Sequence, residues 1–99
     1  MSSPVYQLST DAAFESFNDG ALILNLKDVT FTELNTTARD IIQVTDGRNS
    51  LEQVSEIVAK EYEIGVTVAH TDVKELYEDL LKQGLIEEVK SEPTKERES

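Results

Sequence analysis

Hydrophobic positions alternate with polar ones in the first third of the chain and recur every three to four residues afterwards. Residues 13–17, 21–26 and 29–34 are rich in aromatic, aliphatic and β-branched side chains, which predicts three strands. Asn18-Asp19-Gly20 joins the first two runs and Lys27-Asp28 joins the next two. Connections this short require antiparallel neighbours, so we expect a three-stranded antiparallel meander.

The helical pattern begins after the third strand. Asn35 or Thr36 can cap a first helix that starts near Thr37 and is stopped by Asp46-Gly47. Ser50 and the Gln three residues later form a capping-box pattern at the start of a second helix.

A third helix is expected before the end of the chain. Gly65 suits the left-handed residue that follows the second helix, and Thr67 can cap a helix that runs to about Gln83, with Gly84 as its terminator. The elements together predict an α+β fold, winged helix-turn-helix-like, in which a three-stranded antiparallel sheet is followed by a three-helix bundle.

The two ends of the chain carry short apolar segments. Val5-Tyr6-Gln7-Leu8 is expected to pack across the domain rather than at its centre, and Leu85 to Val89 to dock back on the core. We therefore expect one domain over residues 1–89. Residues 90–99 are charged and lack apolar anchors, which predicts a disordered tail.

The third strand is expected to be a sheet edge. Nothing after residue 34 reads convincingly as a further strand able to pair with residues 29–34. An edge strand exposes a row of backbone donors and acceptors, which is either a liability or a peptide-binding site.

The third helix carries an apolar arc wider than one core contact needs. One interpretation is a central helix gripped on two sides by its own domain. The other is that Val73, Tyr77 and Leu81 line a groove, while Leu76 and Leu80 anchor the helix inside. The residues alone favour the first interpretation.

Charge narrows the range of partners. The chain has 20 acidic and nine basic residues, a formal net charge of −11, and its basic residues are scattered. Such a surface repels phosphate backbones and anionic lipids, so neither a nucleic acid nor a membrane is an expected partner. The chain has no cysteine, no signal-peptide pattern and no apolar run long enough to span a bilayer, so we expect a cytoplasmic protein.

The sequence contains no recognisable combination of residues for a catalytic or metal site. His70 is the one histidine, and without cysteine a zinc site of the usual kind cannot be assembled. We find no calcium loop, no glycine-rich phosphate loop and no nucleophile with a base at a known spacing. The sequence therefore predicts no catalytic residues, no cofactor and no enzyme activity.

The chain carries an ordered set of residues that covers residues 6 to about 89: Tyr6, Leu8, Ser9, Asp11, Phe14, Asp19-Gly20, Leu34-Asn35, Thr37-Ala38, Ile41, Asp46-Gly47, Ile57-Val58, Tyr62, Asp72-Val73, Leu76, Leu80 and Gly84-Leu85-Ile86. This set resembles the PqqD-like proteins, winged-helix peptide chaperones named for pyrroloquinoline quinone biosynthesis. Family members of the quinone pathway have a tryptophan in the second strand and this chain has none, which puts that pathway in doubt.

The resemblance implies a recognition element for ribosomally made, post-translationally modified peptides. The leader segment of a precursor peptide would add as a strand to the third strand and fill the groove beside the third helix, and the domain would present it to a modifying enzyme, such as a radical SAM protein or a peptidase–cyclase pair. With the resemblance, the groove interpretation of the third helix is favoured. The implied peptide-binding residues are Val29, Thr30, Phe31, Thr32, Glu33, Leu34, Val73, Lys74, Tyr77 and Leu81.

Two other functions fit the same elements. Three helices with a small sheet are also the pattern of a winged-helix DNA-binding regulator, although the third helix holds Glu75, Glu78 and Asp79 against Lys74. The same edge could pair with a second copy, which would make the chain a homo-oligomerisation module. We expect a monomer or a weak dimer.

Overall fold

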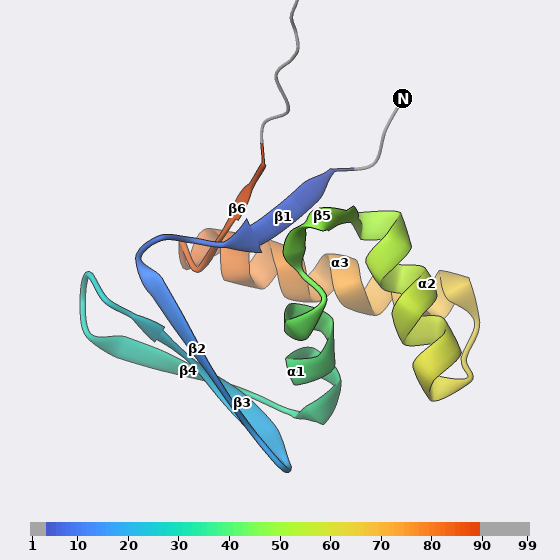
Figure 1. Cartoon of the computed structure of the whole chain (residues 1–99), viewed down its shortest axis with the longest axis horizontal. Helices are drawn as coiled ribbons and strands as arrows, with labels where there is room; N and C mark the ends of the chain where they lie inside the picture. Colours follow the sequence, from blue (N-terminus) through green and yellow to red (C-terminus); the bar gives the residue numbers. More distant parts are fainter. Residues whose placement is uncertain (1–3, 90–99) are drawn as a thin grey trace, which may run out of the picture.

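The computed structural model describes residues 4–89 as an α+β domain (Figure 1). The expected tail at residues 90–99 lies outside this range. The elements in chain order are β1 (Val5–Leu8), β2 (Ala12–Phe17), β3 (Gly20–Asn25), β4 (Thr30–Leu34), α1 (Thr36–Gln43), β5 (Asp46–Ser50), α2 (Leu51–Tyr62), α3 (Val66–Lys82) and β6 (Ile86–Glu88). None of the helices within residues 4–89 is long and apolar enough to cross a membrane.

The predicted meander is confirmed. Strands β2, β3 and β4 form an antiparallel sheet in that order, and the register pairs Ala12 with Asn25 across β2–β3 and Asn25 with Thr30 across β3–β4. A Cβ on Gly20 would lie 2.3 Å from the carbonyl oxygen of Leu34, so the close approach of these two strands requires glycine.

A second small sheet was not predicted. Strand β1 lies at its centre, between β5 and β6 and antiparallel to both. All four residues of β1 are half-buried, which fits the expectation that Val5–Leu8 packs across the domain rather than at its centre. The extended end after Leu85 is confirmed as β6. Strands after residue 34 therefore exist, but they pair with β1 and not with β4.

Strand β5 begins at a turn that Asp46 stabilises. Its carboxylate accepts hydrogen bonds from the backbone N–H groups of Arg48 (3.0 Å) and Asn49 (3.1 Å), and Gly47 is left-handed with φ 83°. These hydrogen bonds favour the charged carboxylate and lower the pKa of Asp46. The same Asp46-Gly47 pair that was expected to stop the first helix therefore opens a strand.

Two helix starts are as predicted. The Asn35 side chain accepts the N–H of Ala38 at 2.8 Å, which caps α1. At α2, Ser50 and Gln53 form the reciprocal capping box, with bonds of 3.2 and 2.8 Å.

The connection between α2 and α3 differs from the prediction. Helix α2 ends at Tyr62, so the left-handed residue is Glu63 (φ 55°) and not Gly65. Gly65 is extended and is the N-cap of α3, which begins at Val66, one residue before the expected cap at Thr67. The far end of α3 is as predicted, since Gly84 is left-handed with φ 73°.

The core lies between the meander and the helices. Helix α1 contacts β3 and β4 on one side and α2 and α3 on the other, and it lies centrally in Figure 1. The side chains of Ile23, Ile41, Val54 and Leu80 are buried at this junction. The arrangement leaves the meander supported along one face.

Candidate functional site

Strand β4 is an open edge of the meander. It pairs with β3 from Thr30 to Leu34 and has no second neighbour among the described residues, which confirms the predicted edge. The other edge of the same sheet is β2. What surrounds each edge decides which of the two could hold a partner strand.

The outward backbone groups of β4 belong to Phe31 and Glu33. The N–H of Leu26 donates to the carbonyl of Asp11 at 2.8 Å, so the even-numbered residues of β3 direct their backbone groups toward β2. Because these groups alternate along a strand, the odd-numbered residues of β3 bond Thr30, Thr32 and Leu34. The N–H and C=O groups of Phe31 and Glu33 therefore point to the open side.

Gln83, the residue that follows α3, reaches the inner face of β4. The Thr32 hydroxyl donates to the side-chain oxygen of Gln83 at 2.8 Å. The Asn25 amide on the adjacent strand approaches the Gln83 carbonyl at 3.4 Å. Gln83 therefore ties the end of α3 to β4, where the groove beside the third helix is expected.

Two of the residues expected in that groove are in the core instead. Val73 is 0% exposed and Tyr77 is 2% exposed, so the expectation that their side chains line a groove is wrong. The Tyr77 ring packs edge-on against Tyr6 with centroids 4.8 Å apart, and its hydroxyl bonds Thr45. Burial raises the pKa of Tyr77 to about 12.

Lys74 and Leu81 are exposed but lie away from β4. Residues of an α-helix follow one another by about 100° around the axis. Lys74 is nine residues before Gln83 and therefore on the opposite side of α3, and Leu81 is offset by about 200°. The structure brings Gln83 to β4 and leaves these two residues on another side of the helix.

The residues of α3 that share the side of Gln83 were not predicted as site residues. They are Leu76, which is half-buried, and Asp79, which accepts a long hydrogen bond of 3.4 Å from the Gln83 side chain. Their spacing of three and four residues is the signal that places them together. That spacing does not tell which side of the helix meets β4.

The side chains of β4 face in two directions. Leu34 is buried and Thr32 is half-buried on the inner face. Phe31 is 64% exposed on the outer face, opposite Leu24 of β3. A strand added to this edge would thus find polar and apolar neighbours on one side and an aromatic ring on the other.

The described residues contain no cluster of three or more histidine, cysteine, aspartate or glutamate side chains that could hold a metal ion. The site therefore consists of the outward backbone N–H and C=O groups of β4 and the partly apolar side chains on its two faces.

Comparison with known proteins assigns the family. The family described as Coenzyme PQQ synthesis protein D (PqqD) matches residues 20–86, more than half of the chain. The chain belongs to the PqqD family. This match spans β3 through the start of β6 and so includes both β4 and α3.

Three solved structures share the PqqD-family fold of this chain. "Lasso peptide synthetase B1 complexed with the leader peptide" has a TM-score of 0.74 at 24% identity and covers 83% of this chain and 96% of that one. "TbiB1 in Complex with the TbiA(beta) Leader Peptide" has a TM-score of 0.75 at 17% identity and covers 82% and 94%.

The third is the PqqD truncation of Methylobacterium extorquens PqqCD, described as a functional and stand-alone recognition element for ribosomally synthesised and post-translationally modified peptides. Its TM-score is 0.71 at 18% identity, over 84% of this chain and 88% of that one. No curated protein matches the sequence significantly.

Proposed function

We propose that the chain is a non-catalytic peptide chaperone that binds the leader segment of a ribosomally made precursor peptide by strand addition to β4. The observation that carries this proposal is the open β4 edge with the end of α3 beside it, fixed by the bond between Thr32 and Gln83. An incoming strand would pair with the outward groups of Phe31 and Glu33 and extend the meander to a fourth strand.

The hydrogen bonds alone do not hold such a strand. Four backbone bonds to Phe31 and Glu33 contribute roughly 2–6 kcal/mol in total. Fixing the backbone of four peptide residues costs roughly 4–8 kcal/mol. Affinity therefore depends on buried leader side chains, each of which contributes about 1.5–3 kcal/mol when it is apolar.

The side chains that would receive the leader differ on the two faces. On the inner face they are Leu76 and Asp79 of α3 and Gln83 just after it, beside Thr32, and on the outer face the exposed ring of Phe31. A leader with apolar residues at alternating positions fits both faces, because alternate side chains of a strand point in opposite directions. Lys74 and Leu81 lie on another side of α3 and are not part of this proposed binding surface.

The comparisons support the peptide class. Two of the similar proteins are described in complexes with leader peptides, and the third as a stand-alone recognition element. The partner enzyme in our proposal is a radical SAM protein or a peptidase–cyclase pair, to which the domain would deliver the bound precursor in the cytoplasm.

The order of helices and hairpins is also of the winged-helix type in our interpretation, which raises the question of DNA. The exposed positions of α3 include Glu75, Glu78 and Asp79, against which Lys74 supplies one positive charge at the middle of the helix. Phosphate contacts require lysine and arginine, so we do not propose a nucleic-acid function.

Peptide titration followed by NMR tests the proposal. A synthetic leader-like peptide with apolar residues at alternating positions should shift the backbone amides of residues 30–34 and 76–83 in a ¹⁵N-labelled sample. Shifts confined to β2, the other edge, would contradict the proposal. Sedimentation of the free chain distinguishes peptide binding from pairing of β4 with a second copy. A chain that stays monomeric at high concentration does not pair through β4.

A further inference from the structure

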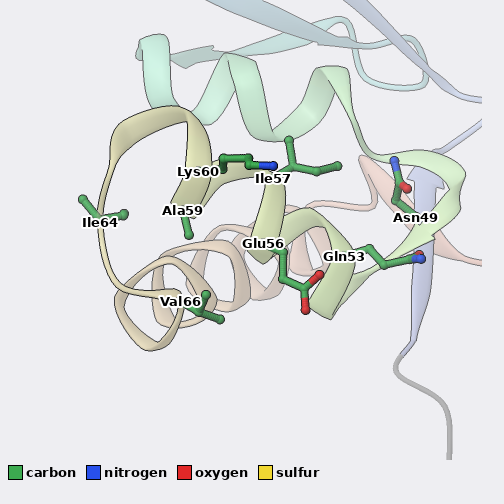
Figure 2. A pocket seen from close by; sticks show the side chains of 8 residues that line it. All are labelled: Asn49, Gln53, Glu56, Ile57, Ala59, Lys60, Ile64 and Val66. Atoms are coloured by element: carbon green, nitrogen blue, oxygen red, sulfur yellow. The ribbon is translucent and has the colours of Figure 1, made fainter.

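The outer surface of α2 carries an apolar hollow that the proposed function does not use. Ile57, Ile64 and Val66 are 39%, 37% and 52% exposed, and all three line one open hollow of about 590 Å³. Figure 2 shows Ile57 and Lys60 on α2, Ile64 on the loop after it and Val66 at the start of α3. Three exposed aliphatic side chains around one concavity are more than scattered surface apolar residues.

The hollow continues across α2 toward α1. Gln53, Ile57 and Lys60 are spaced by four and three residues and therefore form one stripe along the helix. Ile57 also lines a second, narrower hollow on the other side of α2, with Val44 and Tyr62. Together these form a surface, here called the α2 surface, that runs from the start of α3 to α1.

Carboxylates border this surface. Glu56 lines the first hollow and Asp40 and Glu61 line the second, whereas Lys60 is the positive side chain that lines the first. The chain as a whole carries a net charge of −11. A second copy would bring like charges together, so the charge favours a basic occupant.

The α2 surface lies at the opposite end of the molecule from β4. In Figure 1, α2 is at one end of the long axis and the β2-β3-β4 sheet at the other, with α1 between them. A partner on α2 and a strand on β4 would therefore not compete for space.

We propose that the α2 surface docks a basic amphipathic helix of a partner protein, whose apolar side chains enter the hollow while its lysine or arginine side chains meet the surrounding carboxylates. Helices bind apolar grooves through side chains spaced by three and four residues, which matches the stripe on α2. This inference goes beyond the proposed function and holds whether or not β4 binds a leader.

A designed peptide is the probe. The repeat Lys-Leu-Leu-Lys-Lys-Leu-Leu forms a basic amphipathic helix. A control peptide with glutamate in place of each lysine, here called the acidic mirror, has the same apolar face. The basic peptide should shift the amides around Ile57, Ile64 and Val66 of the full-length ¹⁵N-labelled chain, and the acidic mirror should not. Shifts spread evenly over the acidic surface, including Glu75 and Glu78 of α3, would overturn the proposal.

Two valines of α3 give a matched pair of variants. Val66 lines the hollow at 52% exposure, and Val68 is 54% exposed on the same helix outside it. Val66→Lys should weaken binding of the basic peptide at least about fivefold, and Val68→Lys less than about twofold, because only the first places a cation in the contact. Equal weakening would show general charge attraction and reject the site.

Ile57→Lys is the second variant if Val66→Lys unfolds, and it should weaken binding in the same way. Urea unfolding of each variant confirms that the chain is folded during the titration. The β4 edge provides an independent readout: Val66→Lys should leave leader binding unchanged, so failure of the leader titration and failure of the peptide titration are distinguishable.

Discussion

The hydroxyl oxygens of Tyr77 and Thr45 lie 2.6 Å apart inside the core. Thr45 donates its single hydroxyl proton to the carbonyl of Ile41, also at 2.6 Å, so Tyr77 is the donor to Thr45. This chain of two bonds ties α3 to the end of α1 and explains why an aromatic residue with a polar tip occupies a buried position of α3.

We expect Tyr77→Phe to destabilise the domain by about 1 kcal/mol, because it removes one buried hydrogen bond and keeps the ring. Tyr77→Ala should cost about 3–5 kcal/mol, since it also opens a cavity in the core. Urea unfolding followed by circular dichroism measures both. Tyr6→Phe is the control, because the Tyr6 hydroxyl has no hydrogen-bond partner among residues 4–89; an equal loss in this variant would contradict the prediction.

Stability should fall at alkaline pH. Burial raises the pKa of Tyr77 from 10.0 to about 12 in the folded state, so the unfolded chain loses this proton at a lower pH than the folded one. The stabilisation is complete below pH 10 and is lost as the pH rises toward 12, by up to roughly 3 kcal/mol.

Urea unfolding from about pH 9 to about pH 11 checks this slope. Tyr77→Phe should flatten it. A weaker slope should remain, because desolvation raises the pKa of Tyr6 and the bond to Asp40 raises that of Tyr62. An unchanged slope in Tyr77→Phe would assign the effect to these other tyrosines.

Val29→Gly should stabilise the domain by about 0.5–1 kcal/mol. Val29 is left-handed with φ 57° and is 77% exposed at the turn between β3 and β4. A left-handed β-branched residue costs roughly 1–2 kcal/mol, which glycine relieves at the expense of a more flexible unfolded chain. Lys27→Gly in the same turn is the control and should destabilise, since the described residues with positive φ do not include Lys27. A loss of stability in both variants would rule out strain at Val29.

Glu33→Pro should weaken strand addition and leave the fold intact. The N–H of Glu33 points to the open side of β4, so proline removes a donor that the meander itself does not use. We expect leader binding to weaken at least about tenfold, from the lost bond and from the ring in the path of the added strand.

Ser16→Pro is the matched control on the other edge. By the same alternation, the N–H of Ser16 points outward from β2, so this variant removes an equivalent donor there. It should leave leader binding unchanged. If Ser16→Pro weakens binding and Glu33→Pro does not, the peptide occupies β2 instead of β4.

Local patterns predicted the parts of the fold that depend on neighbouring residues. Asn35, Ser50 and Gly84 act at helix ends through contacts within a few residues, and the meander follows from alternation and short turns. Strand β5 was missed because its sequence, Asp46 to Ser50, is polar and has no alternation. It is extended because β1, distant in sequence, pairs with it.

The side of α3 that meets β4 could not be read from periodicity. The spacing of Val73, Leu76, Tyr77, Leu80 and Leu81 describes a wide apolar arc but not which flank the rest of the chain covers. The core takes Val73 and Tyr77. Position Gln83, which carries no apolar signal, makes the contact to Thr32 that orients the helix.

An edge that presents only the backbone of Phe31 and Glu33 recognises no particular sequence by itself. A guest strand displaced by two residues would form the same bonds with the same faces inward, whereas a displacement by one would exchange its faces. Each register shift of two residues moves the unbound part of the peptide by about 7 Å. The distance from this domain to the residues that the enzyme modifies therefore depends on which peptide side chains fix the register. A peptide with a repeated alternating pattern would bind in several registers.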